Sequence, residues 1–352
     1  MNRFKKVLLA IVLAASIGIV ASQDVKAEIT NFPNGVSSWG APVLPGIGGN
    51  IFADVNIYWV DSTDSNAADG AGGGTAESPF STIDFAVGQC TASQGDVIFV
   101  KPNHTETVTA AAGLDLDVIG ISVIGIGSGA DRPNVNFTTV VGADMDVDAA
   151  NIKVYNILFT GGIDATTGVI DVNAADFSLI NCEYRDVTGQ ATDVIVADEE
   201  ADRLLIDGFV FRGSASDGPD TAITLTGSIV TGSTGPDDVI IRNFNIYGNF
   251  DEGAIESKTG GPLRTIIGGG SGWNYIWTEG AEDLAVNLHA TNTGWIGPNI
   301  AIRLQDDGNN IHDSVIGSDT QFIMPLEFVN ANDEVSVQIG TGTSHPASVD
   351  SP

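Results

Sequence analysis

Two neighbouring aspartates beside an arginine come nearest to a catalytic group in this sequence: Asp306, Asp307 and Arg303. Paired carboxylates can cleave a glycosidic bond, because one donates a proton while the other acts as base or nucleophile. Asp-Asp-Gly is also typical of a solvated turn, and Gly308 follows Asp307. These residues are therefore candidates for an acid–base pair, with a turn as the simpler alternative.

Acidic residues at alternate positions indicate a second kind of chemistry, the binding of a cation. Asp144, Asp146 and Asp148 alternate with apolar residues, so a strand would place all three carboxylates on one face. Their spacing is that of the first half of an EF-hand calcium loop, but Ala149 replaces its glycine and Tyr155 its final glutamate. The pattern predicts at most low-affinity Ca²⁺ binding, and no cofactor is required.

Aromatic side chains that could bind a ligand gather late in the chain, at Trp273, Tyr275, Trp277 and Trp295. The first three alternate and should share one face of a strand. On the outside of the protein they would form a platform for sugar stacking or subunit docking. On the inside they would belong to the core, and the sequence leaves both interpretations open.

The charge and composition of the chain exclude other classes of protein. Its 352 residues carry 45 acidic and 14 basic side chains, for a net charge of −31. A nucleic-acid-binding protein needs Lys and Arg to meet phosphate, so this class is excluded. Hydrophobic residues make up 43%, which is too much for an intrinsically disordered chain. The negative charge also argues against polyanionic substrates.

The N-terminal residues 1–27 have the pattern of a secretory signal peptide. Arg3, Lys5 and Lys6 precede the apolar run Val7 to Ala21, which is short for a membrane span. Cleavage is expected before Glu28, so the mature protein would be secreted and would not be held in a membrane. The alternatives are an uncleaved anchor and a buried helix.

The rest of the chain divides into an arm, a repetitive body and a tail. Residues 28–50 are rich in Gly and Pro and predict an extended arm or docking segment, with a plain linker as the alternative. Apolar residues Phe80, Ile83, Ala86 and Val87 have helical spacing. From there to residue 340, short strands rich in Val, Ile and Phe are separated by Gly, Asn and Asp, which predicts an all-β fold. Residues 341–352 are expected to be a flexible tail.

Four segments of the body repeat one pattern, in which an Asn or Asp precedes a short strand and a second follows five residues later. The pairs are Asn151 and Asn156, Asp176 and Asn181, Asp202 and Asp207, and Asp238 and Asn243. The second members are spaced by 25, 26 and 36 residues. Such a repeat predicts a solenoid with three short strands and three turns in each coil, in which polar side chains at the corners bond from coil to coil. A large β-sandwich is the alternative.

The beginning of the body carries a resemblance to known proteins. Its motifs are Tyr58-Trp59-Val60-Asp61, Ser78-Pro79-Phe80-Ser81-Thr82-Ile83, Gly95-Asp96-Val97-Ile98-Phe99-Val100 and Thr105-Glu106-Thr107-Val108. They resemble the N-terminal cap and first coil of right-handed parallel β-helix proteins of the pectin-lyase-like group. The resemblance implies that residues 51–340 form one such domain with a short N-terminal cap helix. Residues 101–113 and 123–137, and residues 29–40 of the arm, also resemble β-helix proteins of bacteriophage particles.

These features favour a non-catalytic structural or attachment protein, either extracellular or on a virion surface, that docks to a protein partner through residues 28–50. The partner would be a further copy of the chain or a capsid-like surface, and a glycan is a second expected ligand. The alternatives are a secreted polysaccharide lyase or glycoside hydrolase, and a glycan-binding adhesin. An enzyme for acidic glycans needs a positive groove, yet Arg185, Arg212 and Arg242 stand at different offsets within their repeats. We therefore expect no such groove.

Overall fold

The computed structural model describes residues 36–38, 41–43, 55–163, 166–186, 191–213, 218–227, 235–258, 260, 262, 264–279, 285–289, 292–304, 315–316, 319–322, 326–329 and 335–338. The chain divides into two units, Met1–Ala53 and Asp54–Pro352. In the first unit, strands β1 (Val36–Ser38) and β2 (Ala41–Val43) form an antiparallel pair. The predicted signal peptide and tail lie outside the described residues, and the predicted domain boundaries stay predictions.

The second unit is built from three sheets, which we call sheets 1, 2 and 3. Sheet 1 contains β3 (Ile57–Val60), β4 (Val97–Val100), β7 (Ser122–Gly125), β10 (Lys153–Tyr155), β13 (Ser178–Ile180), β16 (Leu205–Asp207), β19 (Ile240–Arg242), β22 (Thr265–Ile267), β25 (Thr293–Ile296) and β28 (Asp319–Phe322). Sheet 2 contains β5 (Thr105–Thr107), β8 (Asn134–Phe137), β11 (Leu158–Gly161), β14 (Glu183–Asp186), β17 (Val210–Arg212), β20 (Asn245–Gly248), β23 (Asn274–Thr278), β26 (Ile300–Leu304), β29 (Leu326–Val329) and β30 (Val335–Gln338). Sheet 3 contains β6 (Leu114–Asp115), β9 (Met145–Val147), β12 (Thr167–Val172), β15 (Asp193–Ala197), β18 (Thr221–Leu225), β21 (Gly253–Ser257), β24 (Val286–Leu288) and β27 (Val315–Ile316).

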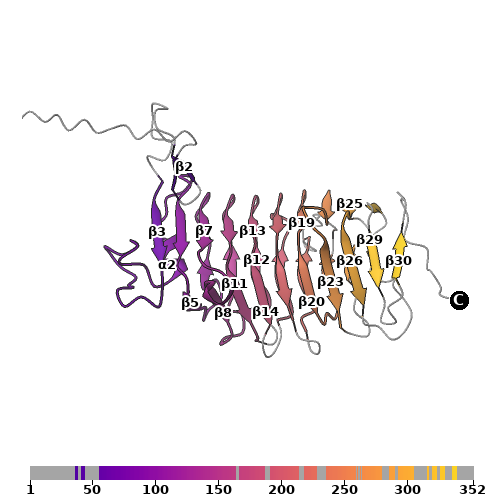
Figure 1. The fold of residues 1–352 in the computed structure, drawn as a ribbon, viewed down its shortest axis with the longest axis horizontal. Coiled ribbons are helices and arrows are strands. Elements are labelled where there is room, and N and C mark those ends of the chain that lie inside the picture. The colour runs from indigo at the N-terminus through magenta and orange to yellow at the C-terminus, as the bar shows by residue number, and fades with distance from the viewer. Residues whose placement is uncertain are drawn as a thin grey trace, which may run out of the picture. The chain divides into compact units, whose positions relative to one another are not determined.

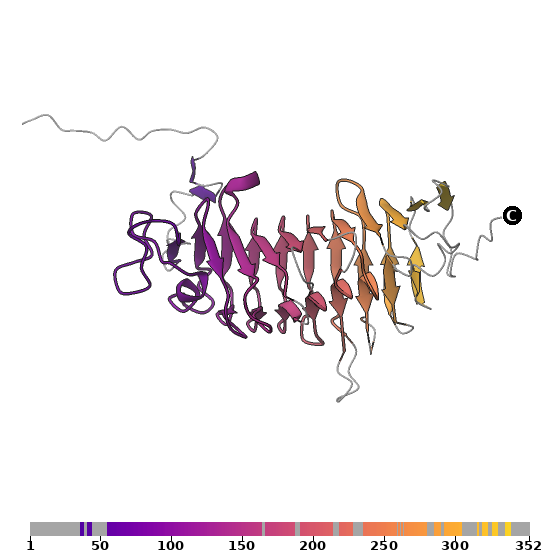
Figure 2. The same cartoon turned by 90° about the horizontal axis from the view of Figure 1, so that it is seen from below.

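Neighbouring strands within each sheet come from successive coils of the chain. Every described pair in the three sheets is parallel except β29 with β30. β10, β11 and β12 follow one another in sequence, and each pairs with the matching strand of the next coil: β13, β14 and β15. The coils stack along one axis of this unit (Figure 1), and the same order is seen from below (Figure 2). The all-β parallel β-helix predicted from the repeat is confirmed.

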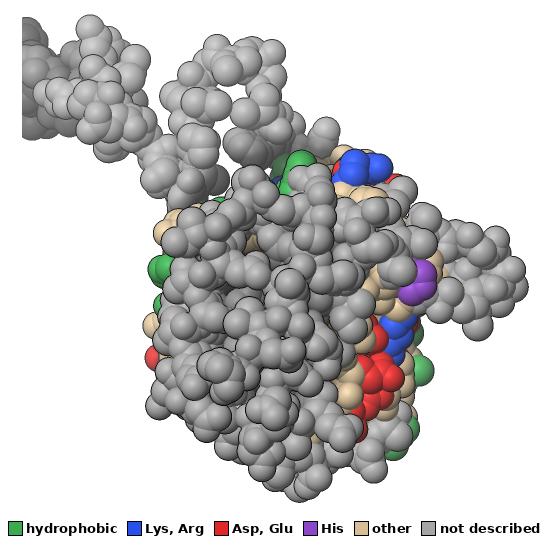
Figure 3. Space-filling model, turned by 90° about the vertical axis from the view of Figure 1, so that its right-hand side faces the viewer, with side chains coloured by type: hydrophobic (Ala, Val, Ile, Leu, Met, Phe, Trp, Pro, Cys, Tyr) green, Lys and Arg blue, Asp and Glu red, His purple; other side chains and the backbone are tan. Residues whose placement is uncertain are grey.

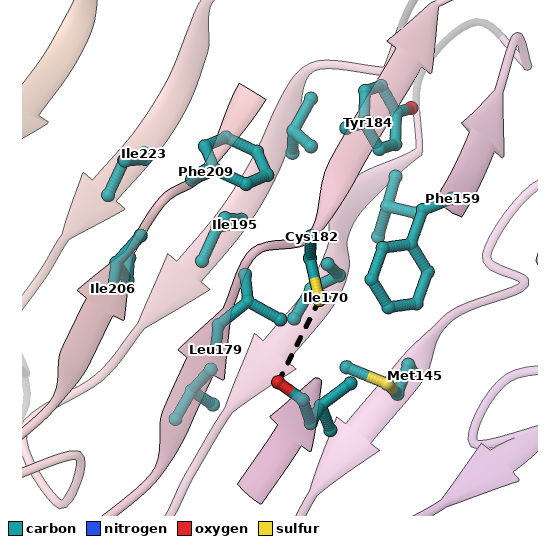
Figure 4. Close-up of a cluster of buried hydrophobic side chains, with 14 of the residues drawn as sticks. Met145, Phe159, Ile170, Leu179, Cys182, Tyr184, Ile195, Ile206, Phe209 and Ile223 are labelled. Atoms are coloured by element: carbon teal, nitrogen blue, oxygen red, sulfur yellow. Dashed lines mark hydrogen bonds between the residues drawn. The ribbon is translucent and has the colours of Figure 1, made fainter. Parts of the chain in front are cut away.

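The core of the solenoid consists of inward side chains that lie above one another from coil to coil. In sheet 2, Phe159, Tyr184 and Phe211 occupy one register position, and the rings of Tyr184 and Phe211 are stacked at 5.6 Å and 5°. Figure 4 shows Cys182 near Phe159 and Tyr184, and its Sγ donates to the carbonyl of Val154 at 3.8 Å. Burying each large apolar side chain stabilises the fold by about 1.5–3 kcal/mol, so the stacked core supplies the main driving force.

The corner between sheets 1 and 2 repeats in each coil, but one repeat is shifted from the prediction. Asn156, Asn181 and Asn243 have positive φ, which asparagine tolerates better than most residues. In the intervening coil the residue with positive φ is Gly208, not Asp207. Gly208 lies 27 residues after Asn181 and 35 before Asn243, in agreement with the strand register. The predicted spacings of 26 and 36 residues were therefore wrong by one.

Hydrogen bonds of His104, just before β5, and of Glu106, within β5, connect segments at the N-terminal end of the solenoid. The His104 ring is buried, and its Nδ1 accepts from the Ser62 amide at 3.0 Å. The ring proton is therefore on Nε2, which donates to Glu106 Oε2 at 3.3 Å. The same oxygen accepts from the Ile83 amide at 2.9 Å. One carboxylate thus joins the Asp61–Ser62 turn to the start of a helix.

That helix, α2 (Ile83–Val87), begins at Thr82, whose hydroxyl accepts from the Phe85 amide. Its buried residues are Ile83, Ala86 and Val87. The sequence also predicts that a short helix covers the N-terminal end of the solenoid as a cap, and this role of α2 stays a prediction. A 3₁₀ turn covers Gly129–Asp131. No helix in the described part of the chain is long and apolar enough to cross a membrane.

Replacement of Gly208 by Ala tests the corner geometry. Gly208 and Gly95 both have φ near 80°. A Cβ added to Gly208 would lie 2.3 Å from Asn181 Oδ1, whereas a Cβ added to Gly95 would have no atom within 4 Å. Gly95→Ala should lower the free energy of unfolding by about 1 kcal/mol through backbone strain alone. Gly208→Ala should lower it by about 2–4 kcal/mol, because it adds a steric clash. Urea denaturation measures both, and equal losses would contradict the stacked corner.

Candidate functional site

The predicted acid–base pair is only partly covered by the structure. Asp306 and Asp307 lie outside the described residues. Arg303 lies in β26, where its backbone pairs with Trp277 on one side and Val329 on the other, and its side chain is not among those described. A catalytic role for these three residues stays a prediction.

One of the three predicted calcium ligands, Asp146, belongs to a row of acidic residues on the outer face of sheet 3. Asp115, Asp146 and Asp171 are direct register partners on β6, β9 and β12, and we call them the acidic row. The flanking Asp144 accepts from the Ala112 amide at 2.5 Å, and Asp148 accepts from the Asn173 side chain at 3.1 Å. Among the described residues, no three His, Cys, Asp or Glu side chains converge as metal ligands. Calcium binding therefore stays a prediction.

Burial and like charges make ionisation of the acidic row unfavourable. Burial, and then the charges of Asp144 and Asp171, raise the pKa of Asp146 to about 7. Burial is also the main cause that raises the pKa of Asp115 and of Asp171. The acidic row therefore destabilises the fold when it is fully charged.

The predicted aromatic ligand-binding residues lie on the outside of the solenoid. They therefore form an exposed surface and do not belong to the core, the two possibilities that the sequence left open. Trp273, Tyr275 and Trp277 are 40%, 49% and 37% exposed, whereas Ile276 between them is buried. Tyr247 on β20 joins them, with its ring edge-on to Trp277 at 5.7 Å and 84°. Trp295 is also exposed but lies on β25 of sheet 1. Sequence analysis missed Tyr247, because only the strand register places it beside Trp277.

Three arginines surround one carboxylate on the same face of sheet 2. Glu183 accepts from Arg132 Nη1 at 3.0 Å, from Arg185 Nε at 2.7 Å and from Arg212 Nε at 3.2 Å. Burial opposes ionisation of Glu183, but the three arginines outweigh it and lower its pKa. Arg185 and Arg212 are direct register partners, while Arg242 lies in sheet 1. The expectation that the arginines would not stack was therefore wrong for this pair.

The arginines and aromatics together form one continuous line, which we call the outer row. Its members occupy the same register position on β11, β14, β17, β20 and β23: Thr160, Arg185, Arg212, Tyr247 and Trp277. Adjacent strands of a sheet are about 4.8 Å apart, so each side chain stands one strand spacing from the next. The outer row thus presents hydroxyl, guanidinium and aromatic groups in a fixed order.

A polar hollow of about 420 Å³ opens on sheet 3, and we call it the Lys258 pocket. It is lined by Glu252, Glu256, Ser257, Lys258, Asn287 and His289. Figure 3, which views the right-hand side of Figure 1, shows acidic and basic side chains gathered near a histidine along one edge. The carboxyl of Glu256 accepts from Asn287 Nδ2 at 3.1 Å, across the pair β21 and β24.

Lys258 organises the carboxylates of this pocket. Its Nζ lies 3.0 Å from Glu252, 3.6 Å from Glu256 and 3.5 Å from Asp193. Burial would raise the pKa of Glu252, but the hydrogen bond and charge of Lys258 lower it. Burial and the charge of Glu252 raise the pKa of Glu256 to about 7. The sequence contained no signal for this site, because Asp193 and Lys258 are far apart along the chain.

No protein-family model, curated protein or solved structure matches this chain. The similarity to pectin-lyase-like and bacteriophage proteins therefore stays a resemblance. The fold itself defines the class of protein as a parallel β-helix, with the outer row on sheet 2 and the Lys258 pocket on sheet 3 as its candidate sites.

Replacement of Asp146 by Asn should stabilise the protein at pH 8 by on the order of 1 kcal/mol, a value reduced for solvent screening. The Asp146 carboxyl loses its proton near its ordinary pKa of 3.8 in the unfolded chain, but near pH 7 in the folded protein. The free-energy penalty that Asp146 imposes on folding therefore grows as pH rises from about 4 to about 7. The gain should therefore disappear near pH 4.

The exposed Asp131→Asn serves as the control for this measurement and should change stability little at either pH. Urea denaturation of the three proteins at both pH values measures the effect. A stabilisation by Asp146→Asn that is equal at pH 4 and pH 8 would contradict the assignment of the raised pKa to this residue.

Proposed function

We propose that this protein is a non-catalytic attachment protein that binds a glycan on the outer face of sheet 2. The observation that carries the proposal is the pair of exposed aromatic rings on β23, Tyr275 and Trp277, with the half-buried Tyr247 of β20 edge-on to Trp277 at 5.7 Å. Sugar rings present C–H groups that pack on aromatic faces, and the polar atoms nearby bond hydroxyls. Exposed aromatics on a regular sheet face are therefore suited to a saccharide chain.

The rigidity of the solenoid supports this role. Each strand of the outer row pairs with a neighbour on both sides, so the spacing and order of its side chains are fixed before a ligand binds. Preorganisation of this kind lowers the entropic cost of binding. A β-helix also places several equivalent positions along one line, which suits a repeating polymer.

The location and partner of the protein form the second part of the proposal. A signal peptide over residues 1–27 would direct it outside the cell, and residues 28–50 would dock it to a protein surface of a cell or virion. The support is the sequence pattern of these segments. In this arrangement the arm anchors the protein and the solenoid presents the glycan-binding face.

Glycan binding is tested with Tyr275→Ala/Trp277→Ala on a glycan array, followed by calorimetry on the best ligand. Removing two exposed rings should weaken binding about 10- to 100-fold, since each stacked ring contributes about 1 kcal/mol. Trp295→Ala is the matched control, because it removes an equally exposed ring from sheet 1 and should bind normally. Full binding by the double variant would refute the proposed surface.

A glycoside-cleaving enzyme is the second candidate, and the Lys258 pocket is the observation that favours it. Glu252 and Glu256 both contact Lys258, yet their pKa values move in opposite directions. A carboxylate beside a carboxylic acid that keeps its proton to about pH 7 is the arrangement that general acid–base catalysis requires. In this reading Glu256 would donate a proton to the leaving group and Glu252 would act as base or nucleophile.

The enzymatic alternative predicts that the protein releases reducing ends from a polysaccharide and that Glu256→Gln lowers this rate at least about 100-fold. The rate should fall as pH rises through about 7, because the general acid then loses its proton. Glu77→Gln, at an exposed site remote in sequence, is the control and should retain full activity. A wild-type protein that releases no reducing ends from a broad polysaccharide panel would exclude this candidate.

A further inference from the structure

We propose that the arginine part of the outer row binds an anionic group, a carboxylate or sulfate, of an acidic glycan. The inference rests on the proposed function, since it assigns a chemical class to the glycan on sheet 2. In this arrangement Arg185 and Arg212 hold the anion, and Tyr247 and Trp277 pack against the sugar rings that follow. The order of these side chains comes directly from the strand register.

The charge balance around Glu183 carries the proposal. Three guanidinium groups contact this single carboxylate, which leaves a local excess of positive charge. One arginine suffices to neutralise a buried glutamate, and Arg132, the least exposed of the three, already does so. Arg185 and Arg212 are 47% and 60% exposed, so the excess charge faces solvent. The structure thus holds two arginines beyond what Glu183 requires.

The geometry of the two contacts suits an incoming anion. Glu183 accepts from Nε of Arg185 and from Nε of Arg212, so these contacts do not use the Nη groups of either residue. A guanidinium presents its donors in a planar fork that matches the oxygens of carboxylate or sulfate. Glu183 therefore holds the Nε side of both guanidinium groups, and the Nη groups are the donors that would meet the anion.

The groups at the two ends of the outer row determine which part of a glycan would face each end. The charge of Glu279 raises the pKa of Tyr247, after the larger contribution of burial, so an acidic group stands near the aromatic end. The opposite end carries Thr160, which donates to Asn134 Oδ1 at 2.8 Å, and Asn136, which accepts from the same asparagine. Among the described side chains of the outer row, an anion is thus favoured over Arg185 and Arg212, with neutral sugar units over Thr160 on one side and over Tyr247 and Trp277 on the other.

The net charge of −31 does not oppose this binding at close range. Charges farther away than about 8 Å are largely screened at physiological ionic strength, so the local arginines dominate the potential at the outer row. The long-range repulsion instead slows the approach of densely charged polymers. The expectation that the net charge argues against acidic ligands therefore does not extend to sparsely charged glycans.

Calorimetry with three oligosaccharides of similar length tests the proposal: hyaluronan, which carries carboxylates, κ-carrageenan, which carries sulfates, and uncharged cello-oligosaccharides. The full-length wild-type protein should bind one of the two anionic probes at least about tenfold more tightly than the neutral probe. This preference should decrease as NaCl is raised from about 0.05 M to about 0.3 M. The probe that binds more tightly distinguishes carboxylate from sulfate.

Arg185→Gln/Arg212→Gln should abolish the preference for the anionic probe, while Glu183 keeps its contact with Arg132. Arg185→Lys/Arg212→Lys preserves the charge and should retain a preference. Arg203→Gln/Arg264→Gln is the matched control, since it removes two exposed arginines that pair with Asp176 and Asp238 outside the outer row, and it should bind as the wild type does. Thermal unfolding of each variant establishes that it is folded.

The possible results separate the inference from the proposed function. Equal binding of neutral and anionic probes by the wild type would overturn the inference and leave glycan binding intact. An anionic preference that survives in Arg185→Gln/Arg212→Gln would overturn the assignment of the site. A failure of the wild type to bind any probe, together with a blank glycan array, would overturn both.

Discussion

The parallel pairing of each coil with the next is the interaction on which the rest of this structure depends. Backbone hydrogen bonds such as Asn156 N to Ile180 O hold residues at the same position in successive coils directly over one another. Because side chains alternate between the two faces of a strand, the same register that stacks Phe159, Tyr184 and Phe211 in the core also aligns the outward positions. One constraint thus produces both the stability and the surface.

The register places side chains of the same charge next to one another on sheets 2 and 3. This arrangement is destabilising on sheet 3, but a third residue compensates for it on sheet 2. On sheet 3, Asp115, Asp146 and Asp171 become direct partners, and burial together with the repulsion of like charges raises the energy of the charged state. On sheet 2, Arg185 and Arg212 also become partners, but Glu183 lies between them and supplies a compensating charge. The arginine pair is therefore stabilised in place and remains accessible, which is the arrangement that a binding site needs.

The two candidate sites differ in how the chain builds them. The outer row uses one register position of consecutive strands, so it is regular and open, as suits recognition of a chain-like ligand. The Lys258 pocket instead brings Asp193 from one coil to Glu252, Glu256 and Lys258 two coils later. Burial raises the pKa of both glutamates, but the hydrogen bond and charge of Lys258 lower that of Glu252, while the charge of Glu252 raises that of Glu256 further. Such a polar hollow, in which a lysine contacts several carboxyl groups, suits proton transfer better than the regular face of sheet 2 does.

The sequence by itself determined the all-β class, the solenoid and most corners, because these follow from local alternation and from polar residues that recur at the turns. It placed two corners of one coil a residue early, since Asp202 and Asp207 match the pattern while the residues with positive φ are Arg203 and Gly208. Whether Trp277 faces outward, that Tyr247 stands beside it, and that Arg185 lies over Arg212 were decided only by the tertiary structure. The physical reason is that coils differ in length, so only the hydrogen-bonded register between them fixes which side chains meet.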